Sequence, residues 1–427
     1  MLASLVEHGI GGVRVRALGV DRAGEVRLGR FLHNPRVTPA EMVATSRARS
    51  LTRVAGRDVL VVQDTTSLRE TVEDSETGET TQRSLQLHPA IVLDAGTGAL
   101  IGLLDAVFLQ RSGGKRATKA KRPFADKESR RWLDMTIRAA ELEKAGATRV
   151  TMVADRESDI YEEFALRPAA VDLVIRVQQD RVLADDTLLS QCLEQAPELG
   201  RETIHLPAGP GRRARDAELS LRARSVSLKA PKRVKYEDAS IPQQVELWLV
   251  EAKEIEPPAG VEPAHWLLFS TRPVPDLATA KAITATYRQR WTIEQLFRTM
   301  KTKGFDIEAS RVEEGGPFEN LAAATLIAAV QVLQMVRERD GQVGQKLEDA
   351  FDAADHPAMA AICKKMEGKT LRQKNPHPPD TMAWIAWICA RLGGWNAYYG
   401  KPGPIVIHQG LLKLQILIQG WNLRALV

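Results

Sequence analysis

The sequence lacks paired cysteines, a long apolar run and a leader-like start. Its three cysteines, Cys192, Cys363 and Cys389, lie far apart and form no C-x-x-C pair, which argues against a disulfide framework and a zinc ribbon. No apolar run approaches the roughly 20 residues of a membrane span, and the first residues do not follow the signal-peptide pattern. Internal repeats and long low-complexity tracts are also missing. We therefore expect a cytoplasmic globular protein that does not enter a membrane.

Positive charge is unevenly distributed along the 427 residues, which are long enough for two to four domains. The net charge of +5 is concentrated in two segments: residues 111–131 hold nine Lys and Arg against two acids, and residues 201–235 hold ten against three. Lys and Arg that neutralise phosphates release condensed counterions, so these segments predict a polyanion partner. A merely solubilising surface is the alternative.

Two buried strands are predicted in the first half of the chain, and each ends at an aspartate. The apolar runs 59–62 and 150–154 are typical of central strands, and they end at Asp64 and Asp155. Ligands of parallel and mixed sheets gather at the carboxyl ends of strands. The two aspartates are therefore candidate ligands, with a cap or turn role as the alternative for each.

The surrounding pattern is that of an α/β protein. It predicts a hairpin at 89–108 with its turn at 95–98, helices at 126–146 and from about 159, and a further strand at 171–179. Four strand-like runs between 200 and 275, separated by Gly, Pro and basic residues, predict a β-rich insertion that is separate from the α/β core and does not continue it. Helical patterns begin near Asp276 and continue to the C-terminus, with a polar, proline-rich link at 368–380.

One predicted helix carries an unusual row of polar residues in the segment YRQRWTIEQLFRTMK, residues 287–301. At about 100° per residue, four of its side chains fall within roughly a 60° arc beside the apolar face. This polar stripe consists of Tyr287, Arg290, Glu294 and Lys301. Its position predicts the border of a groove, whereas a solvated helix face is the alternative.

Asp64, Asp155 and Glu294 form a candidate constellation of three carboxylates. Carboxylates that are brought together repel one another, so such a group is stable mainly when cations neutralise it. Mg²⁺ or Mn²⁺ prefers oxygen ligands of this kind. A pair of these ions would activate a water or a 3′-hydroxyl and stabilise the leaving oxygen of an in-line phosphoryl displacement.

The motifs resemble those of bacterial DDE-type cut-and-paste transposases of the insertion-sequence-four family. The resemblance rests on QDTTSL, which contains Asp64, on DRESDIYEEF, which contains Asp155, and on the spacing Y-x2-R-x3-E-x6-K, which the polar stripe matches in full. Weaker similarity extends from about Gly29 to the C-terminal GWNLRAL, over nine-tenths of the chain.

The resemblance implies an α/β fold: an RNase H-like mixed sheet core with a β-rich insertion and a helical C-terminal region. We expect a shortened N-terminal region at 1–50, part of a DNA-recognition domain, and the first part of the catalytic core at 51–199. The β-rich insertion would occupy 200–275, the final core helices with Glu294 276–340, and a helical dimerisation region 341–427.

The resemblance also implies roles for individual residues. Asp64, Asp155 and Glu294 would be the catalytic residues and the metal ligands, and they would hold two Mg²⁺ ions, for which Mn²⁺ could substitute. Tyr287, Arg290 and Lys301 would hold DNA phosphates, contacts that position DNA without specifying its sequence. Trp266 would stack on a base flipped out during hairpin formation, with a core position as the alternative. The partners would be double-stranded transposon ends and target DNA, bound by a homodimer on the bacterial nucleoid.

Several further residues are weaker candidates. Arg176, in the predicted strand at 171–179, and Arg181, just after it, would contact DNA, although surface arginines are commonly just solvated. Arg156 and Glu157 would orient Asp155. His88 lies where the family has a histidine, with a buried core role as the alternative. The tryptophans of the C-terminal region are expected in helix packing or a dimer interface: Trp384, Trp387 and Trp395.

The sequence departs from the family near its start, because similarity begins only near Gly29 and the preceding residues show poor helical periodicity. This departure leaves three candidate functions. The first is an active DNA transposase that cleaves, forms hairpins and transfers strands. The second is a shortened, non-catalytic inhibitor that acts by dimerisation. The third is an RNase H-like nuclease that cuts DNA without joining it. The intact acidic residues and polar stripe favour a catalytically competent protein over the inhibitor, which would not need them.

Overall fold

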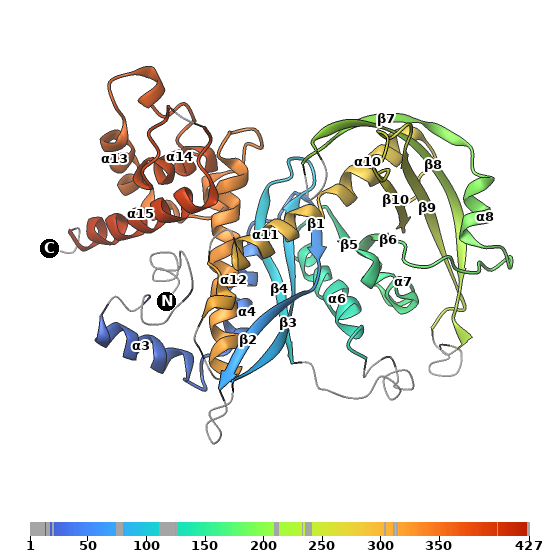
Figure 1. Ribbon diagram of the computed structural model, residues 1–427, viewed down its shortest axis with the longest axis horizontal. Coiled ribbons are helices and arrows are strands. Elements are labelled where there is room, and N and C mark those ends of the chain that lie inside the picture. The colour runs from blue at the N-terminus through green and yellow to red at the C-terminus, as the bar shows by residue number, and fades with distance from the viewer. Residues whose placement is uncertain are drawn as a thin grey trace. The chain divides into compact units, whose positions relative to one another are not determined.

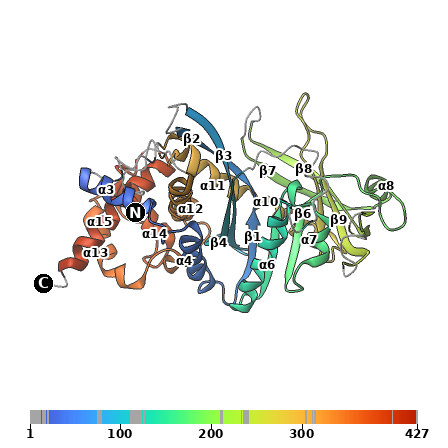
Figure 2. The same cartoon turned by 90° about the horizontal axis from the view of Figure 1, so that it is seen from below.

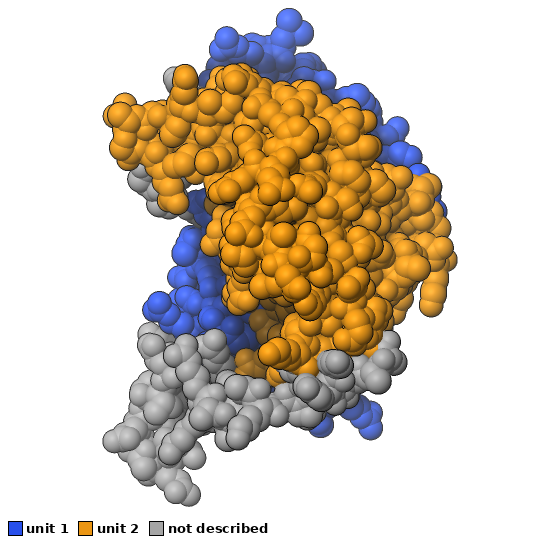
Figure 3. Space-filling model, turned by 90° about the vertical axis from the view of Figure 1, so that its right-hand side faces the viewer, with its two compact units in different colours: residues 1–58, 65–113, 292–427 blue, residues 59–64, 114–291 orange. Residues whose placement is uncertain are grey.

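The protein is described here by a computed structural model, whose strands and helices are shown in Figures 1 and 2. Two compact units, coloured in Figure 3, are formed by residues 1–58, 65–113 and 292–427 (unit 1) and by residues 59–64 and 114–291 (unit 2). The residues that the structure describes are 13, 18, 21–73, 80–110, 124, 127–208, 213–232, 234, 241–302, 305–310, 312, 315–398 and 400–424.

Unit 2 is organised around seven strands. Their order in the sheet is β1 (Asp58–Gln63), β5 (Arg149–Ala154), β6 (Val171–Arg176), β10 (His265–Ser270), β9 (Gln244–Glu254), β8 (Arg215–Lys229) and β7 (Glu198–Leu206). β5 and β6 are parallel, whereas β6, β10, β9, β8 and β7 pair antiparallel in succession. Residues of β1 and β5 are almost all buried, as the continuous apolar runs predict.

The predicted insertion strands are present, but they continue the core sheet. β10 pairs with β6, so that Leu268 lies opposite Arg176. The expectation of a β-rich insertion separate from the α/β core is wrong in this respect. Alternating polarity identifies a strand but not its neighbour, and the free edge of β6 would otherwise leave its backbone groups without ladder partners.

Helices pack against the strands within unit 2. α6 (Arg130–Lys144) buries an apolar face that includes Trp132 and Leu142, and it is followed by Gly146 at a φ of 96°, which ends the helix as predicted. The other helices among the described residues of this unit are η2 (Arg156–Ser158), α7 (Tyr161–Leu166), α8 (Leu189–Glu194) and α10 (Leu277–Arg288). α10 begins where Asp276 accepts the N–H of Thr279 at 2.8 Å.

Unit 1 contains an antiparallel group of strands: β2 (Thr66–Glu73) pairs with β3 (Thr80–Asp94), which pairs with β4 (Leu100–Gln110). The β3–β4 turn is the predicted one, and Asp94 Oδ1 stabilises it by accepting the N–H of Gly96 at 3.0 Å and of Thr97 at 2.9 Å. β2 was not predicted, because its polar and charged residues give no apolar alternation.

The helices of unit 1 include a long apolar one. Those in the described part of this unit are α3 (Arg22–Leu32), α4 (Pro39–Leu51), α11 (Trp291–Lys301), η3 (Ile307–Ala309), α12 (Gly315–Glu338), η4 (Leu347–Asp349), η5 (Ala353–Asp355), α13 (His356–Met366), η6 (Leu371–Gln373), α14 (Met382–Leu392) and α15 (Pro404–Arg424). Residues 316–338 of α12 are long and apolar enough to cross a membrane, contrary to expectation. However, 78% of an apolar 18-residue window within this helix is buried, and the helix packs against strands and helices of unit 1, as a core helix would.

The helix that was expected to carry the polar stripe is interrupted. α10 ends at Arg288 and α11 begins at Trp291, so Gln289 and Arg290 form a turn between two helices. The prediction of one continuous helix over residues 287–301 is therefore wrong, although no Pro or Gly marks the break. The chain nonetheless has the predicted class, an α/β, RNase H-like fold with a mixed sheet and a helical C-terminal region.

Candidate active site

Asp64 and Asp155 follow neighbouring strands of unit 2, as predicted. Asp64 comes directly after β1, and Asp155 comes directly after β5. Asp155 also begins the short helix η2, because its Oδ1 accepts the N–H of Arg156 at 2.8 Å. The backbone of Arg156 thus orients Asp155.

A single arginine contacts both aspartates. Arg290 places Nη1 3.0 Å from Oδ2 of Asp64 and Nη2 3.7 Å from Oδ2 of Asp155. The Arg290 side chain is 11% exposed, and those of Asp64 and Asp155 are 19% and 27% exposed. Two carboxylates that share one guanidinium in a half-buried place are relieved of mutual repulsion. The structure therefore puts a cationic group where the two carboxylates meet.

Tyr287 supports the same carboxylate from the last turn of α10. Its hydroxyl donates to Oδ1 of Asp155 at 3.2 Å, and its ring is almost wholly buried. Burial, followed by the negative charge of Asp155, raises the pKa of Tyr287 to about 12. The phenol is therefore a neutral hydrogen-bond donor near pH 7. Arg176, at the end of β6, adds a guanidinium nitrogen 3.7 Å from the same Oδ1.

An aromatic and arginine-lined cavity of about 450 Å³ lies beside these residues in unit 2. Trp266 lines it from β10, and its ring centroid is 6.3 Å from that of Tyr287. Trp291 also lines the cavity and is 45% exposed; no sequence pattern had indicated this residue, although it adjoins Arg290. The arginines of the lining are Arg176, Arg288 and Arg290.

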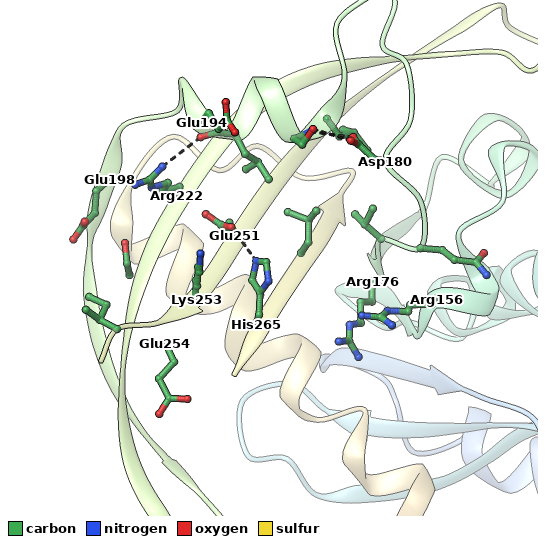
Figure 4. Close-up of a pocket in the computed structure, with 18 of the residues that line it drawn as sticks. Arg156, Arg176, Asp180, Glu194, Glu198, Arg222, Glu251, Lys253, Glu254 and His265 are labelled. Carbon is green, nitrogen blue, oxygen red and sulfur yellow. Dashed lines mark hydrogen bonds and ion pairs between the residues drawn. The ribbon is translucent and has the colours of Figure 1, made fainter. Parts of the chain in front are cut away.

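A larger cavity, of about 830 Å³, lies over the insertion strands and beneath α8 (Figure 4). Arg156 and Arg176 line one end of it, and His265 lies 2.9 Å from Glu251 within it. Its lining contains six Asp and Glu against five Lys and Arg. This balance does not suit a path for a phosphate backbone, so size alone does not identify the active site.

Arg181 and Glu157 have partners of their own. Arg181 contacts Oδ1 of Asp159 at 2.7 Å, and the Asp159 side chain has no exposed surface. This buried pair connects the segment after Asp155 with the segment after β6, which is a structural contact. Glu157 lies 3.5 Å from Arg131. In the described part of the chain, neither the Arg181 side chain nor the Glu157 side chain contacts Asp155.

The remaining two members of the polar stripe belong to unit 1. Glu294 lies in the first turn of α11, and Lys301 is its last residue. Lys301 donates to the backbone oxygen of Ser67 at 2.5 Å and lies 3.8 Å from Glu308. Within the described part of the chain, no three His, Cys, Asp or Glu side chains gather to hold a metal ion. The meeting of Glu294 with the two aspartates therefore stays a prediction.

The donor set of unit 2 nevertheless fits a hard cation. Asp64 and Asp155 offer carboxylate oxygens at adjoining strand ends, and these oxygens already face one shared positive group. Oxygen-only ligands of this kind suit Mg²⁺ and Mn²⁺. A metal would compete with Arg290 for the same oxygens.

Other sequence candidates lie outside this site. His88 is fully buried in β3 of unit 1, where its Nδ1 lies 2.9 Å from Oγ1 of Thr65, which agrees with a core role. Trp384 and Trp387 are buried in α14, as helix packing requires. The first basic segment lies mostly outside the described residues. In the second basic segment, Arg215 forms an ion pair with Glu254 at 2.7 Å.

A comparison with known protein families agrees with this arrangement. Residues 57–331 match the family described as the transposase DDE domain. The match covers more than half of the 427 residues and includes both strand-end aspartates and the whole polar stripe. The chain therefore belongs to the transposase DDE domain family.

Proposed function

We propose that the protein is a cut-and-paste DNA transposase of the insertion-sequence-four type, which cleaves transposon ends, forms hairpins and transfers strands. The observation that carries the proposal is the shared contact of Asp64 and Asp155 with Arg290, beside a cavity lined by tryptophan and arginine. Family membership supports the same activity.

Asp64, Asp155 and Glu294 would hold two Mg²⁺ or Mn²⁺ ions. When bound, the ions would supply an activated water or 3′-hydroxyl and stabilise the leaving oxygen. Both aspartates lie at strand ends, and hydrogen bonds from the Tyr287 hydroxyl and the backbone N–H of Arg156 hold the Asp155 carboxylate. Such support holds carboxylate oxygens in one orientation.

Arg290 would have two successive partners. Without metal, its guanidinium contacts both aspartates and offsets part of their combined negative charge. A metal bound to those oxygens would leave the guanidinium available to a DNA phosphate, for which its planar fork of donors is well suited. Tyr287, Arg176 and, from unit 1, Lys301 would contribute further phosphate contacts that position the strand.

The cavity beside Tyr287 would receive a flipped base during hairpin formation. Trp266 offers an aromatic surface there, and Trp291 lies on the same lining. Stacking on an aromatic ring stabilises a base by about 1–3 kcal/mol, which can offset part of the cost of unpairing. Arg288 and Arg290 would neutralise the adjoining phosphates.

The DNA complex would contain two copies of the chain, joined through α15. This helix buries one apolar row in unit 1 and exposes a second apolar group. The exposed residues are Ile405, Ile416, Leu417, Trp421 and Leu423. An exposed apolar helix face of this kind is typical of an interaction surface.

The test is a cleavage assay on a DNA duplex that carries the ends of the native element, with and without Mg²⁺. We expect Glu294→Ala and Asp64→Asn to abolish 3′-end cleavage while DNA binding, measured by mobility shift, persists. Cleavage retained by Glu294→Ala would remove Glu294 from the site. Products that are cut but never joined to target DNA would favour a nuclease, and a wild-type chain that dimerises without cutting would favour an inhibitor.

A further inference from the structure

A second carboxylate network lies behind the candidate active site in unit 2. Glu163, in α7, has no exposed surface, and its side chain accepts three hydrogen bonds. Oε1 accepts from Nε2 of Gln63 at 3.2 Å and from Oγ1 of Thr136 at 2.8 Å. Oε2 accepts from Oγ of Ser158 at 2.6 Å. All three donors are themselves fully buried.

The three donors come from different elements, and two of these elements directly adjoin the candidate metal ligands. Gln63 is the last residue of β1 and precedes Asp64 in the chain. Ser158 is the last residue of η2, the short helix that Asp155 begins. Thr136 lies in α6, which carries neither aspartate. The Glu163 carboxylate thus connects the two aspartate-bearing segments through side chains rather than through the sheet.

A stabilising role alone explains this arrangement poorly. In the described part of the chain, no cation lies within ion-pair distance of Glu163, whose partners are neutral donors. A buried carboxylate without a counter-ion is costly, and apolar residues of similar volume usually fill a core at lower free energy. What the carboxylate does provide is three directional bonds from one point, which fix the relative positions of the groups that donate them.

We infer that Glu163 is a positioning residue: its carboxylate fixes the end of β1 and the η2 turn, and thereby sets how Asp64 and Asp155 face each other. The inference rests on the proposed function, because it concerns the metal ligands of that site. Supports behind metal ligands typically change metal affinity by about 10- to 100-fold when they are removed.

The experiment measures Mn²⁺ binding to the DNA-free chain, through the loss of the electron paramagnetic resonance signal of free Mn²⁺. Gln63→Leu and Ser158→Ala each cut one bond between Glu163 and an aspartate-bearing segment, and we expect each to weaken Mn²⁺ binding about tenfold. Thr136→Val is the matched control: it removes one bond to the same carboxylate but leaves both of those segments attached. We expect its Mn²⁺ affinity to stay within about threefold of wild type.

Two substitutions of Glu163 itself complete the test. Glu163→Gln keeps an acceptor for Gln63 and Thr136 and can donate to the Ser158 hydroxyl, so it should preserve Mn²⁺ binding. Glu163→Leu removes all three bonds and should weaken binding at least as much as Gln63→Leu. Circular dichroism establishes that each variant folds, and the single-bond variants decide the matter if Glu163→Leu does not.

The outcomes separate this inference from the proposed function. If Asp64→Asn binds Mn²⁺ as well as wild type does, the proposed metal site fails. If Asp64→Asn weakens binding but Gln63→Leu and Ser158→Ala do not, the metal site stands and the positioning role of Glu163 is wrong. Equal losses in Gln63→Leu, Ser158→Ala and Thr136→Val would also overturn it, since a general loss of core stability would account for them.

Discussion

Replacing Arg290 by glutamine should strengthen metal binding even though it removes a residue of the candidate active site. In the metal-free chain, Arg290 lies 3.0 Å from Asp64 and 3.7 Å from Asp155, and a metal must displace both contacts. Partly exposed ion pairs of this kind are worth about 1 kcal/mol each. Together they oppose metal binding by about 2 kcal/mol, or roughly 30-fold in the dissociation constant.

The assay is a titration of DNA-free Arg290→Gln with Mn²⁺, followed by electron paramagnetic resonance, and with Mg²⁺ by calorimetry. Arg288→Gln is the matched control, because Arg288 lines the same cavity but its described hydrogen bond goes to the backbone oxygen of His205. We expect tighter Mn²⁺ binding only in Arg290→Gln, together with weaker DNA binding and a shallower salt dependence. Unchanged or weaker Mn²⁺ binding in Arg290→Gln would refute the idea that Arg290 competes with the metal.

Three further predictions concern other parts of the molecule. Burial raises the pKa of Glu163 from 4.5 to about 7, so its contribution to stability is complete below pH 4.5 and is lost as the pH rises through 7. Thermal unfolding should therefore show Glu163→Gln gaining up to about 3 kcal/mol relative to wild type between pH 5 and 8, and a constant difference would contradict that pKa. Trp266→Ala should allow the first nick but reduce the yield of hairpin on a denaturing gel about tenfold, as the loss of about 1–3 kcal/mol of stacking implies. Trp266→Phe should recover most of the hairpin yield, and equal yields in wild type and both variants would exclude a stacking role. Ile416→Asp on α15 should shift the DNA complex from two copies to one in light scattering, whereas an unaltered mass would place the dimer contact elsewhere.

The strand ends of the site were predictable because they depend on short-range pattern. Continuous apolar runs identified β1 and β5, and the residues at which the runs stop, Asp64 and Asp155, lie where predicted. The helical pattern was also predicted to begin near Asp276, which caps α10 in the structure. In each case one segment of the sequence contains all the information, since burial and capping act within a few residues.

The contacts around those strand ends could not be read in the same way. Arg290 lies in the turn between α10 and α11, from which its side chain contacts both aspartates. Nothing in the local sequence distinguishes it from a residue on a continuous helix. Arg181 also resembled a surface arginine, yet it is paired with the buried Asp159. Both outcomes depend on partners more than 20 residues away, as does the pairing of β10 with β6. Periodicity contains no information about such partners.

The pairing of β10 with β6 has a consequence for how this protein could be altered. Trp266 lies two residues before Leu268, which pairs with Arg176, so a backbone ladder sets the spacing between the tryptophan and the Asp155 contact of Arg176. Lengthening the loops between β7, β8 and β9 would leave that spacing intact. By contrast, one residue added within β10 between Trp266 and Leu268 would turn the indole to the opposite side of the sheet. Insertions of very different size between β7, β8 and β9 should therefore leave the site geometry unchanged, provided that β10 keeps its pairing with β6.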